Sequence, residues 1–186
     1  MATDVTTKLL TAEEFMATDL EDGIFELVRG EVIQLPPPMP EHGVICVNVA
    51  FVLAKYGRET GYGYALSNDS AVVTERDPDT VRGADVCFYS HERWPRSQVG
   101  WKLPPVQPDL VVEVVSPGDR RGEILTKAAE YLASGVSLVW VVYPKKKAVA
   151  IYRSADEPPV VLEHDAVIEN LPELPGFRCL VADLFL

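Results

Sequence analysis

The chain has 186 residues, 47% of them hydrophobic and 24% charged, which is enough to bury the core of one globular domain. Its formal net charge of −11 disfavours broad electrostatic binding of a polyanion, although bound cations or a local basic cluster can invert the field inside a cleft. No run approaches the roughly 18 apolar residues of a membrane span. We therefore expect a cytoplasmic protein that does not enter a membrane.

The N-terminal part predicts a short helix, a hairpin and a long helix. Thr11 is a good N-cap for the first helix, and the strands 25–28 and 31–35 flank an Arg-Gly turn. After a proline-rich spacer, residues 41–56 are apolar around much of their helical circumference. This distribution predicts a helix that is packed on both sides.

The next segment predicts two strands, 64–74 and 84–89, followed by a long irregular connection over 91–105. Trp94 and Trp101 stand in this otherwise polar connection. A long loop with exposed aromatic residues is typical of an active-site lid or of an interface.

Residues 110–143 predict the central unit of the fold. A β-branched run over 110–115 is followed by turn residues and by Asp119, which we expect to cap the helix 120–134. Gly135 ends that helix, and a second apolar run covers 136–143. Two strands joined by one crossover helix are expected to be parallel.

Further strands are predicted at 148–153, 159–162 and 166–168, and the sequence contains no internal repeat or interdomain linker. We therefore predict one α+β domain over residues 1–186, with its core at about 41–153. Cys46, Cys87 and Cys179 are widely spaced among apolar neighbours and form no Cys-x-x-Cys pair. They predict buried thiols rather than a disulfide framework or a thiolate zinc site.

Glu113 is the anomaly in this pattern, because it interrupts the buried run Val111-Val-Glu-Val-Val115. A buried carboxylate is costly unless a cation, a metal or a proton compensates it. Lys127 lies at the edge of the apolar face of the following helix, within reach of the sheet. The pair can be a purely structural ion pair, or it can belong to a functional site.

Asp85 favours the functional alternative. If the strands 84–89 and 109–116 pair antiparallel with Tyr89 opposite Asp109, then Asp85 lies opposite Glu113 on the same face. Two facing carboxylates repel each other unless a positive charge lies between them, and a hard divalent cation fulfils that role. Two acids, a lysine and such an ion suit phosphodiester hydrolysis.

Asp85, Glu113 and Lys127 resemble the scattered signature of the PD-(D/E)XK nuclease superfamily, and the wider pattern resembles its Uma-two branch of restriction-endonuclease-like proteins. The resemblance extends over most of the chain. It rests on these segments: Glu26-Leu-Val-Arg-Gly-Glu31, Glu41-His42, Ala84-Asp85-Val86, Pro108-Asp-Leu-Val-Val-Glu-Val-Val-Ser-Pro117, Lys127, Tyr131, Gly135-Val136 and Trp140.

The resemblance implies a restriction-endonuclease-like αβββαβ core with an N-terminal helix and hairpin. It also implies Mg²⁺, or alternatively Mn²⁺, held by Asp85 and Glu113, with Lys127 beside the ion. Two departures from the pattern stand out. Ala84 replaces the proline before Asp85, and Val115 replaces the lysine two residues after Glu113, so the lysine must come from the helix.

Three further residues are candidates for the periphery of the site. Glu31 can approach from the hairpin, and His42 lies in the first turn of its helix, where a capping role is the alternative. Asp109 shares a strand with Glu113, so it is expected at the rim or as a strand-start cap.

Three functions remain open at this point. The first is a metal-dependent endonuclease acting on DNA. The second is a non-catalytic, dimeric interaction protein on a nuclease fold, and the third is a phosphoesterase for small nucleotides. A homodimer is expected in either of the first two cases.

Overall fold

A mixed eight-stranded sheet forms the centre of the computed structural model, which describes residues 9–20 and 22–186. Its strands follow the order β2-β1-β4-β5-β6-β7-β8, and β3 also pairs with β4. The strands of this sheet are β1 Ile24–Val28, β2 Glu31–Leu35, β3 Gly63–Glu75, β4 Thr80–Ser90, β5 Leu110–Val114, β6 Leu138–Tyr143, β7 Ala148–Tyr152 and β8 Val160–Glu163.

The remaining elements lie around this sheet. The helices are α1 Ala12–Ala17, α2 Pro40–Thr60 and α3 Arg121–Ser134, and short 3-10 turns cover Arg96–Gln98, Pro144–Lys146 and Val181–Phe185. A separate two-stranded sheet consists of β9 Val167–Glu169 and β10 Arg178–Leu180. The succession α2-β3-β4-β5-α3-β6 confirms the predicted αβββαβ core within one α+β domain.

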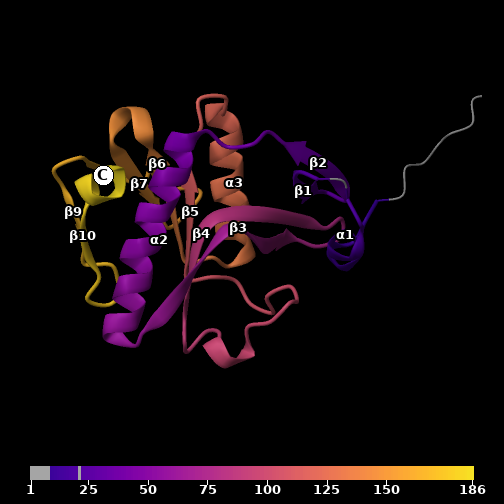
Figure 1. Ribbon diagram of the computed structural model, residues 1–186, viewed down its shortest axis with the longest axis horizontal. Coiled ribbons are helices and arrows are strands. Elements are labelled where there is room, and N and C mark those ends of the chain that lie inside the picture. The colour runs from indigo at the N-terminus through magenta and orange to yellow at the C-terminus, as the bar shows by residue number, and fades with distance from the viewer. Residues whose placement is uncertain (1–8, 21) are drawn as a thin grey trace, which may run out of the picture.

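The two long helices cover opposite faces of the sheet (Figure 1). On the α2 face, Val112, Trp140 and Leu53 belong to a core that also contains the C-terminal segment. On the α3 face, Val111 and Tyr131 belong to the second core. The alternation along β5 follows from the two-residue period of a strand, and β5 and β6 run parallel as predicted.

Two local predictions were wrong. Helix α2 packs against the sheet and against the C-terminal segment, but its outer side is uncovered, since Val44, Val47 and Phe51 are 48%, 67% and 65% exposed there. Asp119 does not cap α3, because its carboxylate accepts a hydrogen bond from the Ser116 amide at 2.7 Å. The N-cap position is Arg120, whose side chain makes no capping hydrogen bond. In both cases the sequence predicted the type of residue correctly, but it did not predict which group that residue packs against or bonds to.

The long connection before β5 places its two tryptophans differently. Trp94 is buried against Tyr89, with ring centroids 5.0 Å apart, and therefore belongs to the core. Trp101 is fully exposed. Only Trp101 thus remains available for the lid or interface role expected of this loop.

Strand β4 has an unusual arrangement of neighbours. One of its edges pairs with β3 over nearly its whole length. The other edge is shared, since β1 pairs with β4 at Leu27–Val81 and β5 pairs with it from Val86 to Phe88. In the described part of the chain, residues 82–85 therefore lie at a gap between the ends of two neighbouring strands.

Within the described residues, no helix is long and apolar enough to span a bilayer.

Two glycines of α2 allow a matched test of its packing. A Cβ atom on Gly57 would collide with the carbonyl oxygen of Gly63, whereas one on Gly43 would meet nothing. We expect Gly57→Ala to lower the free energy of unfolding by about 1–3 kcal/mol through overpacking. Gly43→Ala should raise it by about 0.5–1 kcal/mol through helix propensity. Urea denaturation measures both, and equal effects of the two changes would contradict this packing.

Candidate active site

The gap beside β4 is lined by carboxylates, and Glu113 is one of the two that were predicted from sequence. Its side chain is 15% exposed, and its Oε1 accepts a hydrogen bond from the Tyr131 hydroxyl at 2.7 Å. Its Oε2 lies 3.7 Å from Lys127 Nζ. Burial, reinforced by the repulsion of Asp85 and only partly offset by Lys127, raises the pKa of Glu113 to about 8.

Asp85 enters the gap from β4. The observed pairs Val86–Val112 and Phe88–Leu110 confirm the predicted register, and the pairing ends one residue before Asp85 and Glu113. Instead of a ladder hydrogen bond at that point, Asp85 Oδ2 accepts the Val114 amide at 2.6 Å. The Asp85 side chain thus takes the place of a missing strand partner and is held rigidly there.

Lys127 projects from α3 into the same cluster, but its nearest partner is a residue that was not predicted. Lys127 Nζ lies 2.8 Å from Glu26 Oε1, closer than it lies to Glu113. Glu26, on β1, is 2% exposed and also contacts Arg82 at 2.8 Å. Burial alone would raise the pKa of Glu26, but these two cations hold it below its usual value.

Glu26 also provides a hydrogen-bond acceptor for the backbone at the gap, since its Oε1 accepts a hydrogen bond from the Gly83 amide at 3.2 Å. Arg82 is held in turn by a two-point contact with Glu130 of α3, at 2.8 and 3.0 Å. Lys127 therefore stands at one end of a buried charge network. Burial alone would lower the pKa of Lys127, but Glu113 and Glu26 raise it, so the ammonium stays charged.

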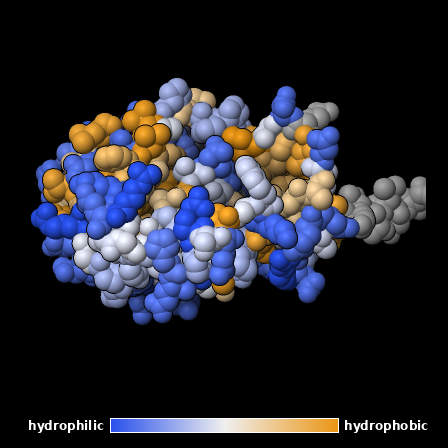
Figure 2. Space-filling model, turned by 60° about the horizontal axis from the view of Figure 1, so that its bottom comes forward, coloured by the Kyte–Doolittle hydropathy of each residue, from blue (hydrophilic) through white to orange (hydrophobic). Residues whose placement is uncertain are grey.

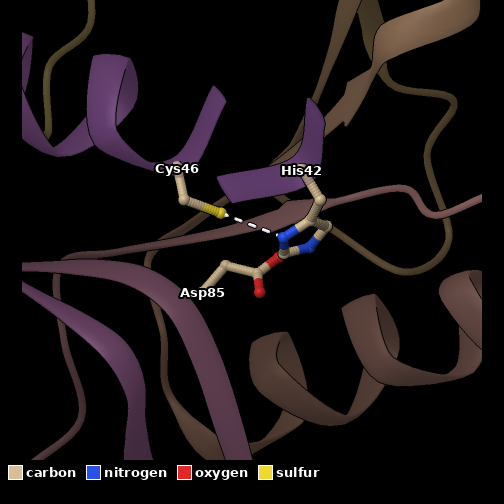
Figure 3. Close-up of side chains that lie close together, drawn as sticks. All are labelled: His42, Cys46 and Asp85. Atoms are coloured by element: carbon tan, nitrogen blue, oxygen red, sulfur yellow. Dashed lines mark hydrogen bonds and ion pairs between the residues drawn. The ribbon is translucent and has the colours of Figure 1, made fainter. Parts of the chain in front are cut away.

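His42 and Cys46 approach Asp85 from the first turns of α2 (Figure 3). His42 Nε2 lies 3.2 Å from Asp85 Oδ2, and the opposite ring nitrogen, Nδ1, lies 3.4 Å from Cys46 Sγ. The hydrogen bonds to Asp85 and Cys46 outweigh burial and raise the pKa of His42 to about 10. The imidazole is therefore a cation that pairs with the Asp85 carboxylate at neutral pH.

Asp69 lies at the rim of this cluster. It belongs to an irregularity in β3, where the register shifts between Ser67 and Ser70 and Asp69 itself has φ 51°. Its carboxylate interacts electrostatically with Asp85, and partial desolvation together with that repulsion raises the pKa of Asp69. Gly83 permits the approach, because a Cβ atom there would come within 3.0 Å of Asp69 Cβ.

The other two peripheral candidates lie elsewhere. Glu31 is exposed and pairs with Val28 at the turn of the hairpin. Asp109 is buried at the opposite end of β5 from Glu113, where it accepts the Ser90 amide at 2.6 Å and pairs with Arg93 at 3.1 Å. These contacts support the strand-start alternative for Asp109. The structure brings Asp85, Glu113, Lys127 and His42 together and leaves Glu31 and Asp109 outside that cluster.

The donors at the gap fit a hard divalent cation. Asp85 Oδ1 has no hydrogen-bond partner among residues 9–20 and 22–186, and Glu113 Oε2 contacts only the Lys127 ammonium there. Each carboxylate thus keeps one oxygen available while the other oxygen fixes its orientation. Carboxylate oxygens in this arrangement are the ligands that Mg²⁺ and Mn²⁺ prefer.

The αβββαβ core of this chain has the restriction-endonuclease-like class of fold, and Asp85, Glu113 and Lys127 lie together beside its central strands. Comparison with known proteins agrees with this class. The model of the Uma2 family, described as "Putative restriction endonuclease", matches residues 12–182. The chain belongs to the Uma2 family.

A solved structure shares the fold. It is described as the crystal structure of a putative nuclease belonging to DUF820 from Anabaena variabilis. The two superpose with a TM-score of 0.80 at 20% sequence identity, over 95% of this chain and 97% of that one. No protein of curated function matches the chain.

The raised pKa of Glu113 makes a prediction about stability. The folded, metal-free protein keeps the Glu113 proton up to about pH 8, whereas the unfolded chain releases it near its ordinary pKa of 4.5. The folded state therefore binds more protons between these values, so this residue's contribution to the free energy of unfolding falls as pH rises and levels off above pH 8.

We expect Glu113→Gln to remove that contribution. In EDTA, the stability of the variant relative to wild type should rise from pH 5 to pH 8 and then stay constant. Thermal or urea denaturation across this range measures the difference, in which the titration of groups that do not interact with Glu113 cancels. A difference that does not change with pH would contradict the buried, protonated state of Glu113.

Proposed function

We propose that this protein is a divalent-metal-dependent endonuclease that hydrolyses phosphodiester bonds in DNA at the gap beside β4. The observation that carries the proposal is the convergence of Asp85, Glu113 and Lys127, each held by separate contacts. Membership of the Uma2 family supports nuclease-like chemistry.

Asp85 and Glu113 would hold the ion, with Mg²⁺ the first choice and Mn²⁺ the second. When bound, such an ion lowers the pKa of a coordinated water and neutralises charge on the phosphate. The chain's own part is to hold its donors rigidly before the substrate arrives. The Val114 amide orients Asp85, and the Tyr131 hydroxyl orients Glu113.

Lys127 supplies a fixed positive charge beside Glu113. Its ammonium is held by Glu26 at 2.8 Å, so little side-chain entropy is lost when a phosphate oxygen approaches. A preorganised cation in a partly buried site stabilises a developing oxyanion more than the same cation in water does. Lys127 of α3 thereby takes the role of the lysine that the superfamily pattern has on the strand, at the position that Val115 occupies in this chain.

The acidic character of the chain bears on the substrate. A net charge of −11 weakens the long-range attraction to DNA. Contacts within the site must therefore contribute most of the binding free energy for the phosphate. This observation favours a second candidate, a phosphoesterase acting on small nucleotides. Three free cysteines are typical of a reducing compartment and support a cytoplasmic setting for either activity.

A cleavage assay tests the proposed function. In 5–10 mM Mg²⁺ or Mn²⁺, wild type should nick a supercoiled plasmid, and EDTA should abolish the activity. Glu113→Gln and Lys127→Ala should each lower the rate by about 100-fold or more, since each removes a charge that acts on the transition state. Glu157→Gln, an exposed acid, is the matched control and should cleave at the wild-type rate.

Two outcomes of that assay would change the proposal. Cleavage that is unaffected in Glu113→Gln would reject this site. Hydrolysis of bis(p-nitrophenyl) phosphate and of dinucleotides without plasmid nicking, and with the same sensitivity to Glu113→Gln, would favour the small-substrate candidate over the endonuclease.

We also propose that the chain forms a homodimer through the outer side of α2. Val44, Val47 and Phe51 lie there at helical spacing, next to the C-terminal Leu186, whose carbonyl accepts a hydrogen bond from Asn48 at 2.8 Å. Exposed hydrophobic residues that gather in this way are typical of interfaces. Figure 2 shows hydrophobic residues among hydrophilic ones on one face of the molecule.

The dimer has its own test. We expect sedimentation equilibrium to give a dimer for wild type and a dissociation constant at least tenfold higher for the double variant Val47→Ser, Phe51→Ser, because these side chains would be buried at its centre. Leu125→Ser, which removes a 39% exposed hydrophobic residue of α3, is the control and should stay dimeric. A wild type that stays monomeric at all concentrations would contradict this interface.

A further inference from the structure

The cluster of His42, Cys46 and Asp85 contains two donors that the proposed magnesium site does not use. Cys46 supplies sulfur and His42 supplies nitrogen, and one ligand atom from each of the three residues lies within 4.8 Å of the other two. Magnesium prefers oxygen ligands, so this set does not serve it. Thiolate and imidazole donors are typical of zinc and related late transition metals.

We propose that His42, Cys46 and Asp85 form a second metal site, which binds Zn²⁺ and shares Asp85 with the proposed Mg²⁺ site. Because one aspartate would compensate the charge of both divalent ions, Zn²⁺ would weaken Mg²⁺ binding at the gap and inhibit the nuclease. The zinc site itself depends only on the three side chains, whereas the inhibition rests on the proposed function.

The geometry of α2 supports the site. His42 and Cys46 are four residues apart, so they lie one above the other on the same side of the helix. With bond lengths of about 2.0 Å to nitrogen and 2.3 Å to sulfur, two ligands of a tetrahedral zinc ion lie roughly 3.5 Å apart. The observed separation of Cys46 Sγ and His42 Nδ1 is 3.4 Å, so the helix already holds two donors at the required spacing.

Asp85 completes the set from the sheet. Its Oδ2 contacts His42 Nε2, whereas Cys46 contacts Nδ1, and a single ion can take only one ring nitrogen. Binding therefore replaces one of these two contacts by a coordinate bond and leaves the remaining position of a tetrahedral ion for water. Asp69 at the rim interacts electrostatically with both His42 and Asp85.

The charge balance also favours zinc. Zinc binds the thiolate form of cysteine and the neutral form of histidine. The Cys46 thiolate and the Asp85 carboxylate together would balance the two charges of the ion in a mostly buried site.

The same three side chains also lie in the order cysteine, histidine, carboxylate, which is the order of the catalytic triads that activate a thiol nucleophile. Burial raises the pKa of Cys46 despite the hydrogen bond to His42, so the thiol is not primed in the metal-free protein. Metal coordination supplies the missing driving force for its deprotonation. The arrangement therefore fits a metal ligand better than a nucleophile.

Cobalt spectroscopy and zinc calorimetry test the site directly. Co²⁺ added to the reduced, metal-free protein should give a near-ultraviolet thiolate-to-cobalt band, and one equivalent of Zn²⁺ should remove it. Cys46→Ala should lack the band and bind zinc at least tenfold more weakly, and His42→Gln should also weaken binding. Cys46→Ser, closest in shape to wild type, repeats the test if the alanine variant unfolds.

Glu113→Gln separates this proposal from the proposed function. This variant loses the magnesium site only, so it should keep the cobalt band and the wild-type affinity for zinc. The cobalt result decides the zinc site even if the protein cleaves no DNA. A missing band in wild type, a band that persists in Cys46→Ala and Cys46→Ser, or its loss in Glu113→Gln would overturn the proposal.

If the protein cleaves DNA, one equivalent of Zn²⁺ should lower the Mg²⁺-dependent rate at least tenfold in wild type. The Cys46→Ala variant should need about tenfold more zinc for the same inhibition. Equal inhibition of wild type and Cys46→Ala would overturn the competition between the two metals, while a cobalt band would still establish the zinc site.

Discussion

The divided edge of β4 is the constraint on which the rest of the site depends. A strand in the middle of a sheet normally satisfies its amides with two continuous neighbours, but β1 and β5 both stop short along this edge. Side-chain carboxylates take over where the ladder ends. Glu26 accepts the Gly83 amide, and Asp85 accepts the Val114 amide. The acids at the gap thus contribute to the fold itself, before any ligand is considered.

Burying these acids sets the electrostatics of the site. Glu26 is neutralised within the fold by Lys127 and Arg82, so it acts as a permanent counter-ion. Glu113 has no partner of that strength, because Lys127 lies 3.7 Å away and is already engaged by Glu26. Its raised pKa follows from this imbalance. An under-compensated carboxylate beside a second one is the arrangement that a divalent cation stabilises most.

Asp85 has a comparable position between two partners. On one side it faces Glu113 across the gap, and on the other it faces the imidazolium of His42 at 3.2 Å. The imidazolium compensates the aspartate in the metal-free protein, which explains how two facing acids are tolerated there. Helix α2 therefore contributes to the electrostatics of the gap as well as to the hydrophobic core below it.

The amino-acid sequence by itself determined the αβββαβ succession, the parallel β5–β6 pair and the antiparallel register that puts Asp85 opposite Glu113. These features depend on local periodicity, on turn residues and on the two-residue alternation of side chains along a strand. All three can be recognised in the sequence. The sequence also singled out Lys127 by its helical position. Glu26 was visible only as part of a family-like segment, and Cys46 only as a buried thiol.

Only the tertiary structure decided which partners these groups meet. It placed Glu26 rather than Glu31 beside Lys127, because the hairpin joins β4 at Leu27 and not at its turn. It brought Cys46 and His42 to Asp85, and it left the outer side of α2 uncovered where the apolar pattern predicted a second packing partner. Such contacts depend on where strands end and how helices cross the sheet. Both are set by packing between segments distant in sequence, which no local pattern encodes.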